Sequence, residues 1–300
     1  MTYDCIVVGG GVAGLQAAIQ LGRYQHQVLV IDSDRGRSTL CRSYHNILGW
    51  PDGVSGQELR QLGKSQAEKL GVHFVADEVV DAHFAEEGFL LKAKRGQSYE
   101  AKRVLLATGV MDRIPNFSSL YPCLGISVYV CPDCDGYEVR NQRTIVMGSG
   151  NVGARMALAL LYWTKDLVYI NHEQAEIESQ LLSQLQEHNI RYIEESIQEI
   201  IAEDSGLKGV RLESGQEIMG ERGFIAFGGN EVKSRLAKQL GVELLDNQHI
   251  VVDPRTKMTN VPHLWAAGDV VAHSEQVAIA MGDGSQAAIW IHKSLVDHEA

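Results

Sequence analysis

The segment Ile6-Val7-Val8-Gly9-Gly10-Gly11-Val12-Ala13-Gly14 decides the fold of this chain. An apolar, β-branched run leads into a Gly-x-Gly-x-x-Gly turn, a pattern typical of a buried parallel strand followed by a helix. The three glycines permit a tight turn, close approach of a pyrophosphate to the backbone, and close packing of helix on strand. The segment therefore predicts a dinucleotide-binding strand–turn–helix unit at the start of the chain.

The same pattern returns later as Ile145-Val146-Met147-Gly148-Ser149-Gly150-Asn151-Val152-Gly153. The following strand of each copy also matches, because Val28–Asp32 aligns with Leu167–Asn171. A single glycine motif is weak evidence, but two copies with matching strands on both sides are specific. We therefore expect an α/β fold with two dinucleotide-binding Rossmann-like domains.

The end of the chain indicates how these domains are arranged along the sequence. Leu264–Asp269 is typical of a buried strand that ends in a carboxylate, and a helix is expected over 275–296. We expect residues 1–113 and 246–300 to form the first, discontinuous domain. The second domain, residues 114–245, is then inserted in the first and includes a helix near 174–188.

Composition limits the classes of function. With 300 residues, 45% hydrophobic content and 22% charged content, the chain has ample core for two globular domains. A net charge of −11 argues against a nucleic-acid partner, and no apolar run approaches the ~20 residues of a membrane span. The first strand begins almost at once, so we expect no signal peptide, and five cysteines without one indicate a reducing compartment. We expect a cytoplasmic protein.

Cys131-Pro132-Asp133-Cys134-Asp135 contains the residues best suited to redox chemistry. Two intervening residues let one thiolate attack a disulfide while the other cysteine resolves the intermediate. A zinc site would need four ligands, and this single pair lacks suitable partners, so we expect no metal. The two aspartates disfavour a thiolate, a helix N-terminus would favour it, and the sequence leaves both outcomes open.

Four motifs in order carry a family resemblance: Gly9-x-Gly11-x-x-Gly14, Ala107-Thr108-Gly109, Cys131-x-x-Cys134-Asp135-Gly136 and Ala267-Gly268-Asp269. Together they resemble the low-molecular-weight thioredoxin reductases over nearly the whole chain. The extended motif that continues through Tyr137 and Glu138 is similar to the subgroup with gliotoxin-type dithiol oxidases. That subgroup often has His after the second cysteine, where this chain has Asp135 as the thioredoxin reductases do.

The resemblance implies tightly bound, non-covalent FAD in the first domain. Asp32 stands where an acid accepts hydrogen bonds from an adenosine ribose, although a strand-end turn is its simpler role. Asp269 is expected to bind the flavin ribityl chain, and capping of the next helix is compatible with that role. The expected FAD contacts are Gly9, Gly11, Val12, Ala13, Gly14, Asp32, Asn46, Val79, Thr108, Gly109, Asp269, Gln276 and Val277.

The resemblance also assigns roles around the cysteine pair. Cys134 would face the flavin, and Cys131 would exchange with the external disulfide or dithiol. Asp135 would be the acid/base that handles the dithiol proton. These three residues are the expected catalytic group.

The second glycine motif lacks the residues that hold NADPH in thioredoxin reductases. Their arginines grip the 2′-phosphate with paired hydrogen bonds, but here the sequence reads Asn171-His172-Glu173-Gln174-Ala175-Glu176. Gly153 also replaces the usual final Ala of the motif. We therefore expect neither NADPH nor NADH to serve directly. Three alternatives stay open: an unused fold, a surface for a protein donor such as ferredoxin, or a different nucleotide such as a second FAD. A second nucleotide would contact Gly148, Gly150, Asn151, Val152, Gly153 and Asn171.

These observations predict a FAD-dependent dithiol/disulfide oxidoreductase that cycles Cys131–Cys134 against the flavin. Its partner would be a thioredoxin-like protein or a small dithiol or disulfide, and the resemblance implies a homodimer. The alternatives are an NAD(P)H-dependent thioredoxin reductase and a dithiol oxidase that uses oxygen. A non-catalytic flavin redox sensor is the alternative from another class, although a sensor needs no acid at the proton-transfer position.

Overall fold

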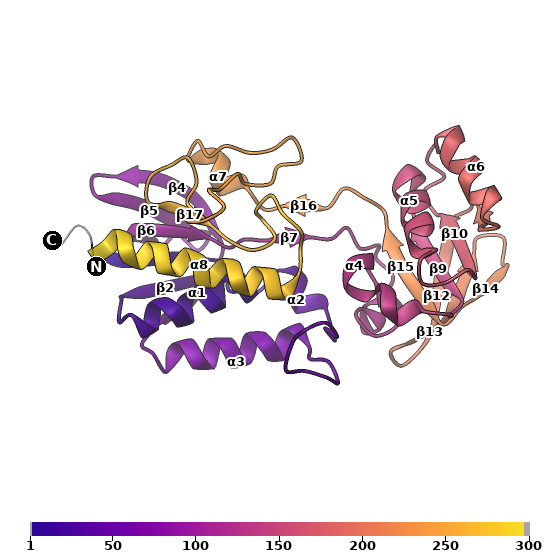
Figure 1. The fold of residues 1–300 in the computed structure, drawn as a ribbon, viewed down its shortest axis with the longest axis horizontal. Coiled ribbons are helices and arrows are strands. Elements are labelled where there is room, and N and C mark those ends of the chain that lie inside the picture. Colours follow the sequence, from indigo (N-terminus) through magenta and orange to yellow (C-terminus); the bar gives the residue numbers. More distant parts are fainter. Residues whose placement is uncertain (1, 297–300) are drawn as a thin grey trace. The chain divides into compact units, whose positions relative to one another are not determined.

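The computed structural model describes residues 2–296, which form two compact units (Figure 1). Unit 1 comprises the described residues up to Thr39, Gly56–Met111 and the described residues from Glu231 onward. Unit 2 comprises Leu40–Ser55 and Asp112–Asn230. Each unit contains one of the two glycine turns.

The unit boundaries differ from the expected ones in two longer segments, and Asp112 and Arg113 also belong to unit 2. Residues 231–245 belong to unit 1, because β16 (Glu231–Val232) pairs antiparallel with β7 (Val110–Met111) and Leu236 of the next helix enters the core of unit 1. Residues 40–55 belong to unit 2, where the Arg42 amide donates a hydrogen bond to the Leu124 carbonyl at 3.1 Å. Both differences arise from contacts between segments far apart in the sequence.

Within the described residues, unit 1 is built on a seven-stranded sheet in the order β3-β2-β1-β6-β5-β4, with β17 also paired to β6. β1, β2, β3, β6 and β17 pair in parallel, whereas β4 and β5 form an antiparallel meander with β6. The strands are β1 (Thr2–Val8), β2 (Val28–Asp32), β3 (His73–Ala76), β4 (Val79–Ala85), β5 (Gly88–Ala93), β6 (Ser98–Leu106) and β17 (Leu264–Ala266). The helices are α1 (Val12–Arg23), α2 (Arg37–Leu40), α3 (Gly56–Glu68), α7 (Arg235–Gln239) and α8 (Val277–Val296).

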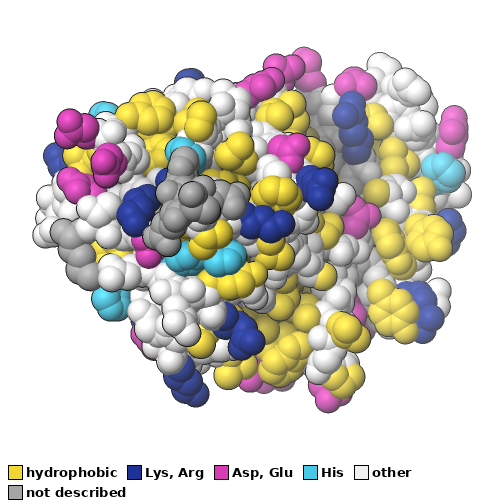
Figure 2. All heavy atoms as spheres, turned by 60° about the vertical axis from the view of Figure 1, so that its left-hand side comes forward, with side chains coloured by type: hydrophobic (Ala, Val, Ile, Leu, Met, Phe, Trp, Pro, Cys, Tyr) yellow, Lys and Arg dark blue, Asp and Glu magenta, His cyan; other side chains and the backbone are white. Residues whose placement is uncertain are grey.

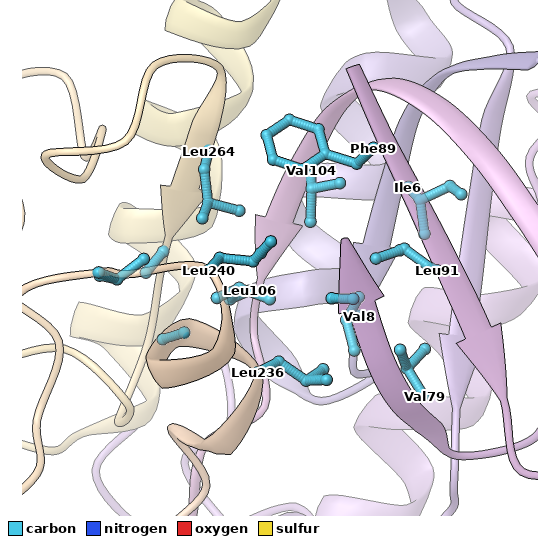
Figure 3. Close-up of a cluster of buried hydrophobic side chains, with 14 of the residues drawn as sticks. Ile6, Val8, Val79, Phe89, Leu91, Val104, Leu106, Leu236, Leu240 and Leu264 are labelled. Carbon is cyan, nitrogen blue, oxygen red and sulfur yellow. The ribbon is translucent and has the colours of Figure 1, made fainter. Parts of the chain in front are cut away.

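Two hydrophobic cores cover the two faces of this sheet. Ile6 and Val8 point into the core that also contains Leu236 of α7 and Leu264 of β17 (Figure 3). Cys5 and Val7, which alternate with them along β1, point into the other core, which α1, α3 and α8 cover. Since consecutive side chains of a strand face opposite sides, the buried part of β1 must be apolar at every position, as Cys5–Val8 is. This double burial fixes the strand that carries the glycine turn.

Unit 2 contains a five-stranded parallel sheet in the order β11-β10-β9-β15-β8 and an antiparallel sheet of β12, β13 and β14, counted over the described residues. The strands are β8 (Val128–Tyr129), β9 (Thr144–Gly148), β10 (Leu167–Asn171), β11 (Arg191–Ile193), β12 (Ile197–Glu203), β13 (Gly206–Leu212), β14 (Glu217–Met219) and β15 (Arg222–Ala226). The helices are η1 (Ser118–Cys123), α4 (Pro132–Asp135), η2 (Gly136–Val139), α5 (Gly150–Leu160) and α6 (Ser179–Glu187). The two α/β units are the two Rossmann-like domains that the sequence predicts.

The surface mixes charges of both signs. Figure 2 shows basic side chains scattered among acidic and hydrophobic ones on one face of the molecule. No helix within residues 2–296 has the length and apolar character needed to cross a membrane.

Candidate active site

The first glycine turn brings two strands and a helix into close contact. Gly9 has a φ of +107°, and a Cβ added to it would lie 2.3 Å from the Ala107 carbonyl oxygen after β6. A Cβ on Gly14 would lie 2.0 Å from the Gly9 carbonyl oxygen. Only glycine fits at either position, because the obstructing atoms are backbone atoms that cannot move aside.

The start of α1 fits a pyrophosphate. Gly11 is the N-cap residue, and no side chain caps the helix. The nearest atom to a Cβ added at Gly11 is Ser38 Oγ, at 3.9 Å, so space remains beside the turn. Exposed N–H groups at a helix N-terminus favour phosphate groups through hydrogen bonds and the helix dipole. Gly11, Val12 and Ala13 therefore form a suitable cradle for FAD.

Asp32 lies beside this turn, at the end of β2. A Cβ added to Gly10 would be 2.9 Å from an Asp32 carboxylate oxygen. The carboxylate accepts a 2.6 Å hydrogen bond from Arg60 of α3, and Arg60 also pairs with Asp34 at 2.8 Å. Its placement suits a contact with an adenosine ribose. Arg60 stands 28 residues away in a helix with no recognisable motif, so the sequence gives no signal of this contact.

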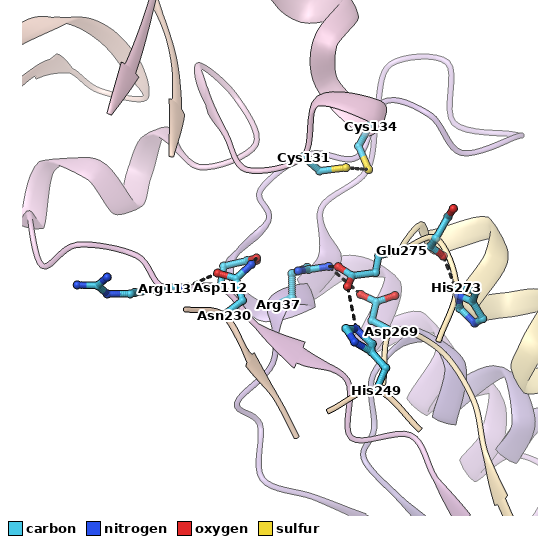
Figure 4. A network of polar contacts seen from close by, with 11 residues as sticks. Arg37, Asp112, Arg113, Cys131, Cys134, Asn230, His249, Asp269, His273 and Glu275 are labelled. Carbon is cyan, nitrogen blue, oxygen red and sulfur yellow. Dashed lines mark hydrogen bonds and ion pairs between the residues drawn. The ribbon is translucent and has the colours of Figure 1, made fainter. Parts of the chain in front are cut away.

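Asp269 belongs to a second polar network of unit 1. Arg37 donates to Asp269 at 3.0 Å and to Glu275 at 2.5 Å, and Glu275 also contacts His249 at 3.3 Å (Figure 4). The network orients the Asp269 carboxylate in the loop between β17 and α8. The observed helix α8 begins at Val277, two residues after the expected start at residue 275. Gln276 therefore directly precedes the helix, and Val277 is its first residue.

The remaining expected FAD residues have varied surroundings. Thr108 donates from its hydroxyl to the Lys233 carbonyl at 2.7 Å, and Gly109 follows with a φ of +68°. Val79 is buried in the core of the sheet. Asn46 belongs to unit 2, whereas the other expected FAD residues belong to unit 1.

The two cysteines of the motif lie together in unit 2. Cys131 precedes α4, Pro132 occupies the first turn, and the Cys131 and Cys134 sulfurs are 2.7 Å apart (Figure 4). The hydrogen bond from Cys134 lowers the pKa of Cys131, despite burial and the nearby aspartates that oppose a thiolate. The direction is towards ionisation of Cys131, and its largest cause is the neighbouring thiol of Cys134.

Asp135 is suited to proton transfer. Burial, reinforced by the negative charge of Glu138, raises the pKa of Asp135 to about 7. A carboxyl group with such a pKa can both hold and release a proton near neutral pH. Glu138 in turn lies 3.3 Å from His45 and accepts from Arg222 through its carbonyl at 3.2 Å. His45 and Arg222 were missed, because only the fold brings them to this motif.

The second glycine turn is filled by side chains of unit 2. A Cβ on Gly153 would lie 2.3 Å from the ring of Tyr169, whose hydroxyl donates to the Gly150 carbonyl at 2.8 Å. Tyr169 thus explains why Gly153 stands where Ala is usual. Asn171 is fully buried, accepts from the Gly150 amide at 2.9 Å and donates to the Ala175 carbonyl at 2.8 Å.

The loop after β10 is tied to the start of α5. Asn151 accepts from the Glu178 amide at 2.8 Å and donates to the Glu178 carboxylate at 2.7 Å. These bonds keep residues 173–178 out of helix, so α6 begins at Ser179 instead of near Gln174 as expected. Val152, by contrast, is half exposed at the first turn of α5.

The residues that stand in place of the phosphate-binding arginines provide no unpaired positive charge. Glu173 forms an ion pair with Arg113, and the hydrogen bond from Ser149, followed by that from Arg113, lowers the pKa of Glu173. His172 accepts from the Ile197 amide at 2.8 Å through Nδ1, and burial lowers the pKa of His172. The neutral His172 and the anionic Glu173 offer a 2′-phosphate no attraction. Arg113, which the sequence analysis missed, already has an acidic partner.

No group of three His, Cys, Asp or Glu residues suited to a metal ion occurs within the described part of the chain.

Comparison with known proteins places these features in a family. Residues 3–284 match the pyridine nucleotide-disulphide oxidoreductase family. The thioredoxin reductase of Coxiella burnetii is 27% identical over 305 residues, which cover 96% of this chain and 94% of that protein.

Solved structures agree in both fold and coverage. A putative thioredoxin reductase TrxB from Bacillus anthracis has 30% sequence identity and a TM-score of 0.85, covering 99% of this chain and 100% of its own. The structure of HlmI has 29% identity and a TM-score of 0.87, covering 99% of this chain and 94% of its own. The predicted resemblance and the two-Rossmann-domain fold are confirmed.

Proposed function

Because this chain belongs to the pyridine nucleotide-disulphide oxidoreductase family and is a thioredoxin reductase-like flavin disulfide oxidoreductase, we propose that it cycles Cys131–Cys134 against FAD without direct use of NADPH. One contrast carries the proposal. The cysteine pair has a neighbouring acid suited to proton transfer, whereas the second glycine turn lacks the arginines that would bind the 2′-phosphate of NADPH. Catalysis would need Cys131, Cys134 and Asp135. The open turn at Gly9–Gly14 and the carboxylates of Asp32 and Asp269 would hold the cofactor.

The cysteine pair supplies a balanced two-electron exchange. When the reduced pair closes to a disulfide, it gives up two electrons and two protons, which FAD accepts when bound. In the opposite direction the disulfide accepts them and opens. Asp135, with its pKa of about 7, holds one of these protons beside the sulfurs. The lowered pKa of Cys131 supports its role as the thiol that attacks an external disulfide.

The contacts of three residues support independence from NADPH. Asn171 uses its side-chain amide on the Gly150 turn and the Ala175 carbonyl. His172 uses Nδ1 on a backbone amide, and Glu173 presents a carboxylate paired with Arg113. A 2′-phosphate would therefore lose two charge-assisted contacts, each worth about 1.5–3 kcal/mol. The electron donor would be a reduced protein such as ferredoxin or a dithiol.

The partner would be a thioredoxin-like protein or a small dithiol or disulfide, and we propose a homodimer as the working assembly. The names of the relatives favour the thioredoxin-like partner, since several are thioredoxin reductases. They equally make an NAD(P)H-dependent thioredoxin reductase the second candidate function. A second FAD on unit 2 remains an alternative use of its Gly148–Gly153 turn, with Val152 exposed beside it.

Anaerobic stopped-flow mixing tests the proposal. We expect NADPH at micromolar concentration to leave the flavin absorbance unchanged for seconds, whereas a dithiol or reduced ferredoxin bleaches it. Bleaching by NADPH within seconds would establish the second candidate instead. Reoxidation by oxygen with turnover of a small dithiol would identify a dithiol oxidase, and absence of turnover with every dithiol would identify a redox sensor.

A further inference from the structure

Asp283 is a buried carboxylate in the second turn of α8. It is 5% exposed, and the next residue lies against α1, since a Cβ on Gly284 would be 2.1 Å from the Ala13 carbonyl oxygen. A charge buried between helices destabilises a protein unless partners compensate it. The proposed redox chemistry makes no use of this group, so its partners are informative.

Asp283 has three partners, all within unit 1. One carboxylate oxygen accepts from Lys257 at 2.8 Å. The other accepts from the Gly268 amide at 3.2 Å and from His273 Nε2 at 2.5 Å. The carboxyl group is thus satisfied on both oxygens by two side chains and one backbone amide.

The contacts of His273 fit its cationic form. Its Nδ1 lies 2.8 Å from the Ser274 carbonyl, and its Nε2 faces the Asp283 carboxylate. Because both partners only accept hydrogen bonds, both ring nitrogens must donate, which requires the imidazolium form. The hydrogen bond with Asp283 raises the pKa of His273, consistent with this assignment. Burial opposes ionisation of Asp283, but the bonds from His273 and Lys257 bring its pKa below the ordinary value. The two cationic side chains hold the Asp283 carboxylate from two sides, next to the separate Arg37–Asp269–Glu275 network of the same turn.

The cluster of Asp283, Lys257 and His273 holds the turn that leads to Asp269. Gly268 has a φ of +79°, and a Cβ on it would lie 2.8 Å from the Cβ of Ala13 in the first turn of α1. The Gly268 amide that Asp283 binds is therefore one peptide from the carboxylate expected to bind the ribityl chain. Gly268 also lies against the start of α1, which fits the pyrophosphate.

We propose that Asp283 is a positioning residue for FAD, which with Lys257 and His273 fixes the Gly268–Asp269 turn in the conformation that binds the cofactor. This inference rests on the proposed function, because it requires that unit 1 bind FAD. Asp283 itself need not touch the cofactor. It acts through the Gly268 peptide, whose amide it holds in place.

The first experiment compares Asp283→Asn with Asp246→Asn, an exposed aspartate of the same unit. FAD is removed, and its rebinding is measured by the change in flavin fluorescence. We expect Asp283→Asn to weaken FAD binding about 10- to 100-fold, the scale of losing charge-assisted hydrogen bonds, and Asp246→Asn to leave it unchanged. Circular dichroism of the apoprotein checks that both variants fold. Unchanged FAD affinity in a folded Asp283→Asn variant would overturn the proposal.

The second experiment uses His273→Gln, which retains one hydrogen bond to Asp283 but cannot become charged. In the wild type, FAD affinity should fall about fivefold as pH rises through the raised pKa of His273, because the neutral ring holds the Asp283 carboxylate less firmly. The variant should bind FAD with little pH dependence over the same range. A purely structural role would not produce this difference, so identical pH profiles would overturn the proposal even if Asp283→Asn fails to fold.

Wild-type binding separates the two levels of inference. If the wild-type protein binds no FAD, the proposed function fails and the role of Asp283 fails with it. If the wild type binds FAD and exchanges electrons with a dithiol, but both variants behave like the wild type, only the role of Asp283 fails.

Discussion

The two glycine turns have the same spacing but different surroundings. In unit 1 the start of α1 has no side-chain cap, and space remains beside Gly11. In unit 2 Asn171 occupies the Gly150 amide, and Tyr169 fills the space beside Gly153. Glycine spacing therefore determines the path of the backbone, whereas the residues on the next strand determine whether the turn is available to a nucleotide.

The same comparison extends to chemistry. Unit 1 has the carboxylates of Asp32 and Asp269, suited to a ribose and a ribityl chain. The thiol of Cys5 in its first strand is buried, and burial raises the pKa of that thiol, which disfavours redox chemistry there. Unit 2 lacks the phosphate clamp but holds the cysteine pair and Asp135. We infer a division of labour, with cofactor binding in unit 1 and dithiol exchange in unit 2.

The largest expected effect tests the assignment of dithiol chemistry to unit 2. Replacing Asp135→Asn should slow electron transfer from a dithiol to the flavin by about 10²- to 10⁴-fold, because the group that exchanges the proton is lost. The wild-type rate should change near pH 7, where Asp135 titrates, and the variant should lose that change. Anaerobic stopped-flow absorbance measures both.

Asp133→Asn is the matched control, since Asp133 lies in the same short helix but is exposed. Equal slowing in the two variants would mean that Asp135 acts only through general charge. Replacing Cys134→Ser should abolish the exchange, because no disulfide can then form with Cys131.

A second prediction compares the glycine turns directly. Gly14→Ala should destabilise unit 1 by about 3 kcal/mol or more and prevent FAD binding, because the new methyl group meets the Gly9 backbone. Gly153→Ala meets the ring of Tyr169 instead, which can shift, so a cost of about 1–3 kcal/mol is expected with FAD retained. Thermal melts and bound flavin per chain give the two readouts.

The double variant Gly153→Ala/Tyr169→Val tests the reason for the second effect. Removing the ring makes room for the methyl group, so the double variant should be less destabilised than the sum of the single variants. Additive effects would show that Tyr169 does not impose the glycine.

A third prediction aims to open unit 2 to NADPH. Glu173→Arg/Gln174→Arg removes the carboxylate, releases Arg113 and adds two exposed guanidinium groups beside the turn. NADPH affinity should rise about 10- to 100-fold, as measured by titration calorimetry. Glu173→Gln alone is the control that separates loss of repulsion from gain of a clamp, and no gain over this control would argue that the turn itself is blocked.

The smallest expected effect concerns pH and the stability of unit 1. The pKa of His273 is raised in the folded protein, so its stabilising contribution is complete below about pH 6.5 and is lost as pH rises through the folded pKa. The pKa of Asp283 is lowered, so its contribution is complete above about pH 3.8 and is lost as pH falls through the folded pKa. Wild-type Tm should therefore fall slightly towards high pH, and His273→Gln should lose that part of the fall. An unchanged Tm profile in the variant would contradict the assignment.

Much of this molecule follows from local sequence. The run Ile6–Gly14 and its repeat predict both units, because buried parallel strands and tight turns require particular residues at neighbouring positions. Cys131, Cys134 and Asp135 are also found locally, since a redox pair needs a fixed short spacing. The sequence Asn171–Glu176 contains no arginine, which by itself predicts that this segment cannot bind a 2′-phosphate as thioredoxin reductases do.

Tertiary structure alone decided the environment of those residues. Arg37, Arg60, Arg113, His45 and Asp283 belong to no motif, and each meets its partner through the fold. Tyr169 gives no sequence signal that it excludes a side chain at Gly153, and the pKa of Asp135 depends on its burial. Backbone turns are determined by residues a few positions apart, whereas charge, burial and space depend on whichever distant segments pack against them.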